Sequence, residues 1–101
     1  MELEICKACG RKLEPKLAVR HQIIPEDIAI LFSILDSAAA TLCVQCSDEI
    51  RDWYRGQVST LTYDSALQHF RSKLPNEIRK EYQTAYQLFL DYKGKRRKRF
   101  S

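Results

Sequence analysis

The sequence lacks the segments that mark secreted and membrane-spanning proteins. Among its 101 residues, no apolar run reaches the roughly 18–20 residues that a membrane-spanning helix needs. The N-terminal residues, Met1-Glu-Leu-Glu4, have neither the basic start nor the apolar stretch of a secretory signal. We therefore expect an intracellular, cytoplasmic protein without a membrane span.

The chain is also short of surface that it can bury. Its length suits one small domain, in which the hydrophobic core alone contributes limited stability. A metal ion would offset part of that shortfall. The sequence contains four cysteines. Because the cytosol is reducing, four cysteines in a chain without a secretory signal favour metal binding over disulfides.

The cysteines form two pairs with the spacing of metal ligands, Cys6-Lys-Ala-Cys9 and Cys43-Val-Gln-Cys46. Two thiolates separated by two residues can both reach one tetrahedral ion, and two such pairs supply a complete set of four sulfur ligands. A redox Cys-x-x-Cys motif needs only one pair, in a strand–helix context. The spacing therefore predicts one structural Zn²⁺ ion, held by Cys6, Cys9, Cys43 and Cys46.

Each cysteine pair lies beside a recognisable local pattern. Residues 5–20 have the pattern of a zinc knuckle and hairpin, with Gly10 at a tight turn after the second cysteine. After the second pair, Ser47 is a candidate helix cap, and the spacing predicts a helix over Asp48–Gly56. Its apolar face would carry Ile50, Trp53 and Tyr54. A knuckle followed directly by a helix is typical of a treble-clef zinc finger.

Between the pairs, Pro25-Glu26-Asp27 predicts the start of a helix. The segment Ile28–Leu35 that follows is apolar on nearly all sides, so it should be buried in the core or lie at an interface. Core burial is the simpler interpretation. The alternative is that Ile28–Leu35 contacts a second copy of the chain or a larger protein partner.

The C-terminal half favours helices. Thr62 could cap a helix whose apolar face would be Tyr63, Ala66, Leu67, Phe70 and Leu74. Pro75 would end it, and Asn76-Glu77 would start a longer helix that ends near Tyr92. The apolar stripe of that last helix would consist of Ile78, Tyr82, Ala85 and Phe89. The predicted fold is α+β, mostly α. It comprises a treble-clef domain over 1–58, a helical hairpin packed on it over 59–92, and a basic tail over 93–101.

The positive charge is concentrated at the C-terminal end. The formal net charge is +4, yet a group of six cations contributes +6, and the other 95 residues carry 11 basic and 13 acidic side chains. Such runs often contact the phosphates of nucleic acids. The six cations are Lys93, Lys95, Arg96, Arg97, Lys98 and Arg99. A second basic cluster lies on the predicted zinc hairpin and includes Arg11, Lys12, Lys16 and Arg20.

Residues 5–55 resemble the HNH, or His-Me finger, endonuclease family. The resemblance rests on the paired knuckles, on His21-Gln-Ile-Ile-Pro25 and on Leu42-Cys43-Val-Gln-Cys46. It implies a structural zinc and, in an active member, a second divalent ion that carries phosphodiester cleavage. Family members place a metal ligand at the position of His21, a histidine base at Gln22, an orienting asparagine near Ala38 and a final histidine at Ser47.

The sequence departs from that catalytic pattern at most positions. Gln22 cannot accept a proton at neutral pH, and Ala38 offers no side-chain hydrogen bond. We therefore expect a zinc-stabilised module that binds nucleic acid, with DNA favoured, and that has no chemistry of its own. If it binds DNA, we would place it with the nucleoid. The alternatives are a divergent HNH endonuclease that uses His21 and a second divalent ion, and a regulatory adaptor that docks on a protein through Ile28–Leu35.

Overall fold

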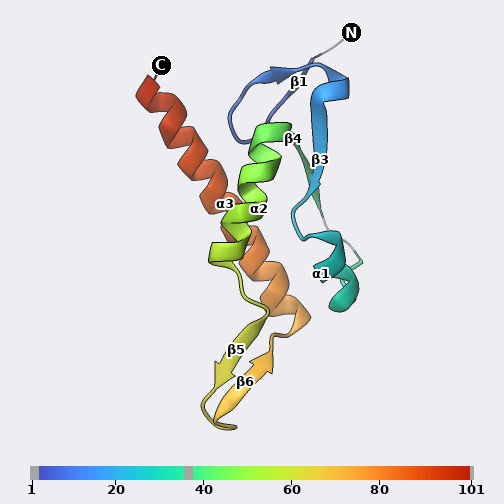
Figure 1. Ribbon diagram of the computed structural model, residues 1–101, viewed down its shortest axis with the longest axis vertical. Helices are drawn as coiled ribbons and strands as arrows, with labels where there is room; N and C mark the ends of the chain where they lie inside the picture. The colour runs from blue at the N-terminus through green and yellow to red at the C-terminus, as the bar shows by residue number, and fades with distance from the viewer. Residues whose placement is uncertain (1–2, 36–37, 101) are drawn as a thin grey trace.

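The computed structural model describes residues 3–35 and 38–100, and it describes side chains as far as Lys95 (Figure 1). Over these described residues the fold is α+β, as predicted, with three α-helices and three short antiparallel sheets. None of the helices in the described part of the chain is long and apolar enough to cross a membrane. In chain order the elements are β1 (Glu4–Ile5), β2 (Lys12–Leu13), a 3-10 turn (Pro15–Leu17), β3 (Ala18–Gln22), α1 (Glu26–Leu31), β4 (Ala39–Cys43), α2 (Val44–Gln57), β5 (Leu61–Asp64), β6 (His69–Ser72) and α3 (Pro75–Phe100).

Each sheet is a pair of antiparallel strands: β1 with β2, β3 with β4, and β5 with β6. The longest pairing joins β3 to β4 and places Ala18 opposite Cys43 and His21 opposite Ala40. Figure 1 shows β1, β4 and the start of α2 near one end of the elongated molecule, with the β5–β6 hairpin at the other end. The chain therefore returns to its N-terminal knuckle just before α2 begins.

The core is built where α2 packs against α3. Ile50 of α2 and Ile78 and Phe89 of α3 are almost fully buried. The indole Nε1 of Trp53 donates a hydrogen bond to the carbonyl oxygen of Ala85 at 3.0 Å, which fixes the two helices together at a second point. These contacts confirm the predicted apolar stripe of the last helix, since its four members are all buried: Ile78, Tyr82, Ala85 and Phe89.

The predicted helix over residues 62–74 is wrong, and so is the helical hairpin over 59–92. This segment forms the β5–β6 hairpin, followed by the single helix α3. The Oδ1 atom of Asp64 accepts hydrogen bonds from the amides of Ala66 and Leu67, at 2.9 and 3.2 Å, and so stabilises the reversing turn. Tyr63 and Phe70 are seven residues apart, which matches two helical turns but also suits opposite positions on two paired strands.

Two helix boundaries also differ from the prediction. Helix α2 begins at Val44 with Cys43 as its N-cap, so Ser47 is not the cap but a buried residue inside the helix. Helix α3 does not end near Tyr92 but continues to Phe100. The basic segment therefore extends a helix that is anchored on the core.

The segment Ile28–Leu35 is only partly buried. Helix α1 ends at Leu31, where the amide of Ile34 donates to the carbonyl of Ala29 at 2.8 Å and Ser33 adopts a positive φ of 56°. Such a bond over five residues, with a left-handed residue inside it, closes a helix C-terminus. Core burial holds for Ala29, Phe32 and Ile34, whereas three other apolar side chains are exposed: Ile30, Leu31 and Leu35.

Candidate metal centre

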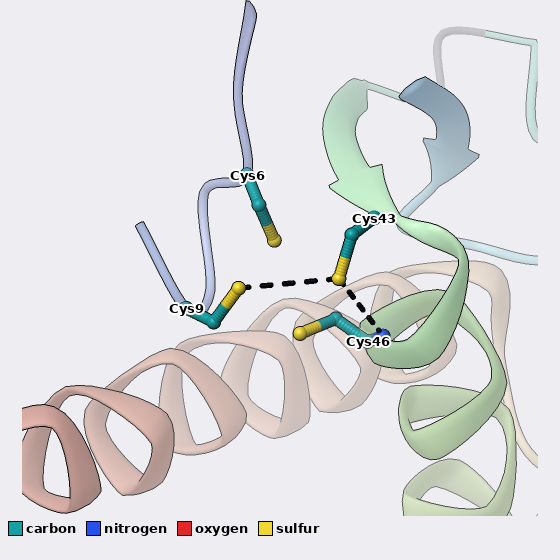
Figure 2. A group of neighbouring side chains, drawn as sticks. All are labelled: Cys6, Cys9, Cys43 and Cys46. Carbon is teal, nitrogen blue, oxygen red and sulfur yellow. Dashed lines mark hydrogen bonds between the residues drawn. The ribbon is translucent and has the colours of Figure 1, made fainter. Parts of the chain in front are cut away.

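The four cysteines converge on one point, although 34 residues separate Cys9 from Cys43. Their sulfur atoms all lie within 4.8 Å of one another. The Cys9 and Cys43 sulfurs are 3.9 Å apart, and Cys6, Cys43 and Cys46 are each at most 4% exposed. Figure 2 shows the thiols of both pairs directed toward a common centre, above the ribbon of α3. This tetra-cysteine group can hold one metal ion.

The first pair is positioned by a knuckle between β1 and β2. The amide of Cys6 donates to the carbonyl of Arg11, and the amide of Gly10 donates to the carbonyl of Cys6, both at 2.9 Å. Gly10 has a φ of 77°, which is strained for a residue with a side chain, so the predicted tight turn after Cys9 is confirmed. The amide of Lys7 donates to the carbonyl of Thr41 at 2.9 Å, and this bond holds the knuckle against β4.

The second pair is positioned by the junction of β4 and α2. Cys43 ends the strand and caps the helix, and its sulfur accepts a hydrogen bond from the amide of Cys46 at 3.4 Å. The amides at a helix N-terminus carry partial positive charge, which favours negative charge on nearby sulfur. The strand and the helix together therefore present two sulfurs beside the N-terminus of α2.

The thiols do not all favour the same charge state. Burial opposes ionisation of Cys6, but hydrogen bonds from the backbone amides of Cys9, Cys43 and Ala8 outweigh it and lower its pKa to about 7. Burial raises the pKa of Cys9. Burial also raises the pKa of Cys46, and the neighbouring Cys43 and Cys6 sulfurs raise it further. Four thiolates this close need a cation among them, and metal binding supplies it while releasing the protons.

Helix α3 is tied to the metal centre by Lys93. Its Nζ atom lies 2.9 Å from a carboxylate oxygen of Glu49 on α2, and the lysine side chain is only 12% exposed. Burial disfavours the charged ammonium, but Glu49 and the nearby Cys46 and Cys9 sulfurs outweigh it and raise the pKa of Lys93. The prediction that Lys93 contacts nucleic acid stays a prediction, and in the structure this side chain is occupied in an internal ion pair.

The other predicted basic residues are on the surface. Arg11, Lys12, Arg20 and Lys95 are exposed, and Lys16 is exposed with its Nζ 3.4 Å from Glu14. The side chains of Arg96, Arg97, Lys98 and Arg99 lie outside the described residues. Because Lys93 lies beside Cys9 and Cys46, the basic end of α3 starts at the metal centre that also carries the knuckle. Of the second cluster, Arg11 lies at the knuckle, where its carbonyl accepts a hydrogen bond from the Cys6 amide, whereas Arg20 lines the separate cleft on β3.

His21 lies at the wall of a separate cleft. This β3–α2 cleft has a volume of about 630 Å³ and is lined by residues of β3, α1 and α2, including Gln22, Ser47 and Arg51. The His21 ring is 7% exposed, and its Nε2 lies 3.4 Å from the hydroxyl of Tyr54. Burial, and to a lesser degree the charge of Arg51, lowers the pKa of His21. The imidazole is therefore neutral at pH 7.

The cleft brings together His21, Gln22 and Ser47, three of the positions that the HNH resemblance singles out. Ala38 lies nearby, since its carbonyl accepts a hydrogen bond from the amide of Ile23 at 3.0 Å. Sequence reasoning named Ser47 and Tyr54 but missed two other cleft residues at helical spacings of three and four from them, Arg51 of α2 and Val58 at its C-cap. Among the residues at 3–35 and 38–100, the four cysteines are the only group of three or more His, Cys, Asp or Glu close enough to hold an ion.

In comparisons with known proteins, no family model, no curated protein sequence and no solved structure matches this chain. The chemistry that the centre can support is therefore inferred from its own residues. Those residues are soft sulfur donors in a buried, closed arrangement, which is typical of a structural metal site and not of an open catalytic one.

We predict that Cys46→Ser loses the metal ion and the folded state together. A hydroxyl replaces one of four sulfur ligands, and structural metal binding contributes roughly 10 kcal/mol or more, comparable to the whole stability of a small domain. Metal content by elemental analysis and helicity by circular dichroism measure both effects. The control is Val44→Ser, which makes the same type of polar substitution in the same helical turn at an exposed position. A folded, metal-free Cys46→Ser protein would contradict a structural role.

We also predict that His21 makes the fold less stable as the pH falls. Its pKa in the folded protein is below the ordinary value of 6.5, so around and below that pH the unfolded chain binds more protons than the folded one. Proton binding stabilises the unfolded chain and therefore lowers the free energy of unfolding. His21→Gln keeps a polar group beside Tyr54 but cannot be protonated. Its stability should therefore change less than that of the wild type between about pH 7.5 and about pH 5.5.

Chemical denaturation at each pH measures this difference. The matched control is His69→Gln, which removes the other histidine of the chain from an exposed strand of the β5–β6 hairpin. A change in the pH dependence that His21→Gln shows and His69→Gln does not would assign the effect to His21. An equal pH dependence in His21→Gln and the wild type would show that His21 does not titrate differently in the two states.

Proposed function

We propose that the bound ion is zinc and that the fold around it is a treble clef. A tetrahedral zinc with Zn–S bonds of about 2.3 Å places its sulfurs about 3.8 Å apart. The 3.9 Å between the Cys9 and Cys43 sulfurs supports this ion. The order of knuckle, β3–β4 hairpin and α2, with one cysteine pair at each end, supports the treble clef.

We infer that the scaffold resembles an HNH endonuclease whose catalytic residues have been replaced. The β3–α2 cleft supports the resemblance because it collects His21, Gln22 and Ser47 between a strand and a helix. The replacements argue against catalysis. Gln22 cannot act as a base, and His21 is engaged with the Tyr54 hydroxyl in a buried position.

We propose that the protein is an intracellular, zinc-stabilised module that binds nucleic acid, with DNA as the favoured target, and that it associates with the nucleoid. The observation that carries this proposal is that α3 continues as one helix from the core through the basic segment to Phe100. The ion pair of Lys93 with Glu49 anchors that helix beside the zinc knuckle. The basic end of α3 and the basic knuckle can therefore approach one phosphate backbone together.

The proposal predicts how strongly DNA binding depends on salt concentration. With Lys93 withdrawn into its ion pair, five cations remain at the end of α3: Lys95, Arg96, Arg97, Lys98 and Arg99. Each phosphate that they neutralise releases condensed counterions, and the slope of log K against log salt is about −0.9 per phosphate on duplex DNA. Five contacts would contribute a slope of about −4 to −5.

We predict that replacing these five cations by glutamine makes the salt dependence of DNA binding shallower by about 4. Fluorescence anisotropy with a labelled duplex, measured over a series of salt concentrations, gives the slope. A second variant, with Arg11, Lys12 and Lys16 replaced by glutamine, should also make the salt dependence shallower, but by a smaller amount. Lys80→Gln removes an exposed charge from the same helix far from the zinc knuckle and serves as the control.

An unchanged slope in the five-residue variant would mean that the end of α3 does not contact phosphate. If the wild type binds no nucleic acid at low salt, the protein-docking alternative through Ile28–Leu35 gains support instead. That alternative has its own observation, because Ile30, Leu31 and Leu35 are each more than 70% exposed. The partner would be a larger protein or a second copy of the chain.

The second candidate function is a divergent HNH endonuclease. It is favoured by the acidic side chains of Glu26 and Asp27, which line the same cleft as His21. We predict no nicking of supercoiled plasmid with magnesium, manganese or nickel, because Gln22 and Ala38 replace the base and its orienting residue. Cleavage that His21→Gln abolishes, while the zinc content stays at one equivalent, would establish the enzyme and a second divalent ion.

A further inference from the structure

The β5–β6 hairpin has an apolar face that is turned away from its own protein. Side chains alternate between the two faces of a strand, and the pairings of Leu61 with Ser72 and of Tyr63 with Phe70 place these four residues on one face. Leu61, Tyr63 and Phe70 are 50%, 57% and 65% exposed. In an ordinary hairpin with one solvated face, the apolar side chains would be the buried ones.

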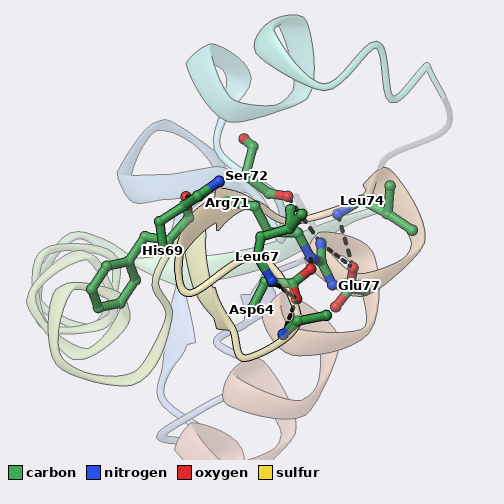
Figure 3. Close-up of polar contacts among 9 residues, drawn as sticks. Asp64, Leu67, His69, Arg71, Ser72, Leu74 and Glu77 are labelled. Carbon is green, nitrogen blue, oxygen red and sulfur yellow. Dashed lines mark hydrogen bonds and ion pairs between the residues drawn. The ribbon is translucent and has the colours of Figure 1, made fainter.

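The opposite face is polar and is turned toward α3. It carries Thr62, Asp64, His69 and Arg71. The guanidinium of Arg71 lies 3.4 Å from Asp64 and 3.3 Å from Glu77 of α3, as Figure 3 shows. These contacts bind the polar face of the hairpin to the start of α3.

Two further contacts hold the base of the hairpin to α3. The Lys73 ammonium lies 2.5 Å from the Glu81 carboxylate, and the lysine side chain is only 11% exposed. The amide of Leu74 donates to Glu77 at 3.0 Å. Turning the hairpin over would break these bonds and leave Lys73 buried without its partner, which is costly. The outward direction of the apolar face is therefore built into the fold.

We propose that this face, made of Leu61, Tyr63 and Phe70 and flanked by Leu67 and Leu74, packs against the same face of a second copy of the chain. All five side chains are at least half exposed. At roughly 100 Å² each, they offer about 500 Å² of apolar surface per copy, so two copies would bury about 1,000 Å² in total. That area reaches the size at which specific interfaces begin.

The charge distribution suits a copy of the same chain. The central apolar residues and Ser72 bear no formal charge, while the charged residues nearest to them, Asp64 and Arg71, pair with each other on the opposite face. Two identical faces therefore meet without like-charge repulsion at their centre. The interface is isologous, so that Tyr63 of one copy contacts Phe70 of the other and the reverse.

The proposal has a structural reason in the hairpin itself. An isolated two-stranded hairpin is at best marginally stable in water, and this hairpin leaves its apolar face exposed. Tyr63 and Phe70 form an edge-to-face pair with ring centroids 5.5 Å apart, which gives the face a rigid aromatic centre. Packing two such sheets face to face removes both centres from water and stabilises both hairpins.

Sedimentation equilibrium over a concentration series tests the dimer. We expect reversible dimerisation, and we expect Phe70→Glu to weaken it at least about 30-fold, because it places a charge at the centre of the interface. Tyr63→Thr, a good strand former, should weaken it without unfolding the hairpin. The matched control is Leu88→Glu, at an exposed leucine of α3, which should leave the dissociation constant unchanged.

Isotope-filtered NOEs between labelled and unlabelled copies locate the contact independently. We expect cross-peaks between the Tyr63 and Phe70 rings of different copies. A protein that remains monomeric up to its solubility limit would overturn the proposal. So would a dimer that Leu35→Glu dissociates and Phe70→Glu does not, because its interface would then be the exposed end of the α1 segment. One zinc per chain shows that the metal centre is retained in each variant, and NOEs between the paired residues Leu61 and Ser72 show that the hairpin is retained.

Discussion

The convergence of four thiols at one point is the constraint on which the rest of the structure depends. It joins a knuckle made of two-residue strands to the start of α2, two pieces of chain that lie more than 30 residues apart. Neither β1–β2 nor the N-terminus of α2 buries enough surface to hold this geometry alone. A cation bound by these sulfurs would therefore have both an electrostatic and a topological role, because it would close the loop that contains β3, α1 and β4.

The ion pair between Lys93 and Glu49 connects α3 to the metal centre. This ion pair lies beside the sulfurs, and the aromatic contacts of Trp53 with Phe89 and Tyr92 continue along the same two helices. A basic segment that starts from such an anchor has a defined position relative to the knuckle that carries Cys6 and Cys9. Because of this fixed position, the basic end of α3 and the knuckle could contact the same phosphate backbone. A flexible tail would bind phosphates without any fixed register.

The two ends of the molecule have different characters. One end carries the cysteines, the knuckle and the basic end of α3, and the other carries the β5–β6 hairpin with its outward apolar face (Figure 1). A dimer through the hairpin would leave both basic ends free and pointing away from the interface. Two linked binding modules gain affinity through effective concentration, provided that the spacing of the sites allows both to engage.

The sequence by itself determined the four-cysteine group and the buried stripe of α3, because both depend on local spacing: two residues between thiols, and three or four between apolar side chains. Only the tertiary structure decided that residues 62–74 pair as strands, since the seven-residue interval between Tyr63 and Phe70 satisfies a helix equally well. It also decided that Lys93 is internal and that His21 faces Tyr54. Those partners lie more than 30 residues away in the chain, and no local pattern specifies which distant side chain a charge or a ring will meet.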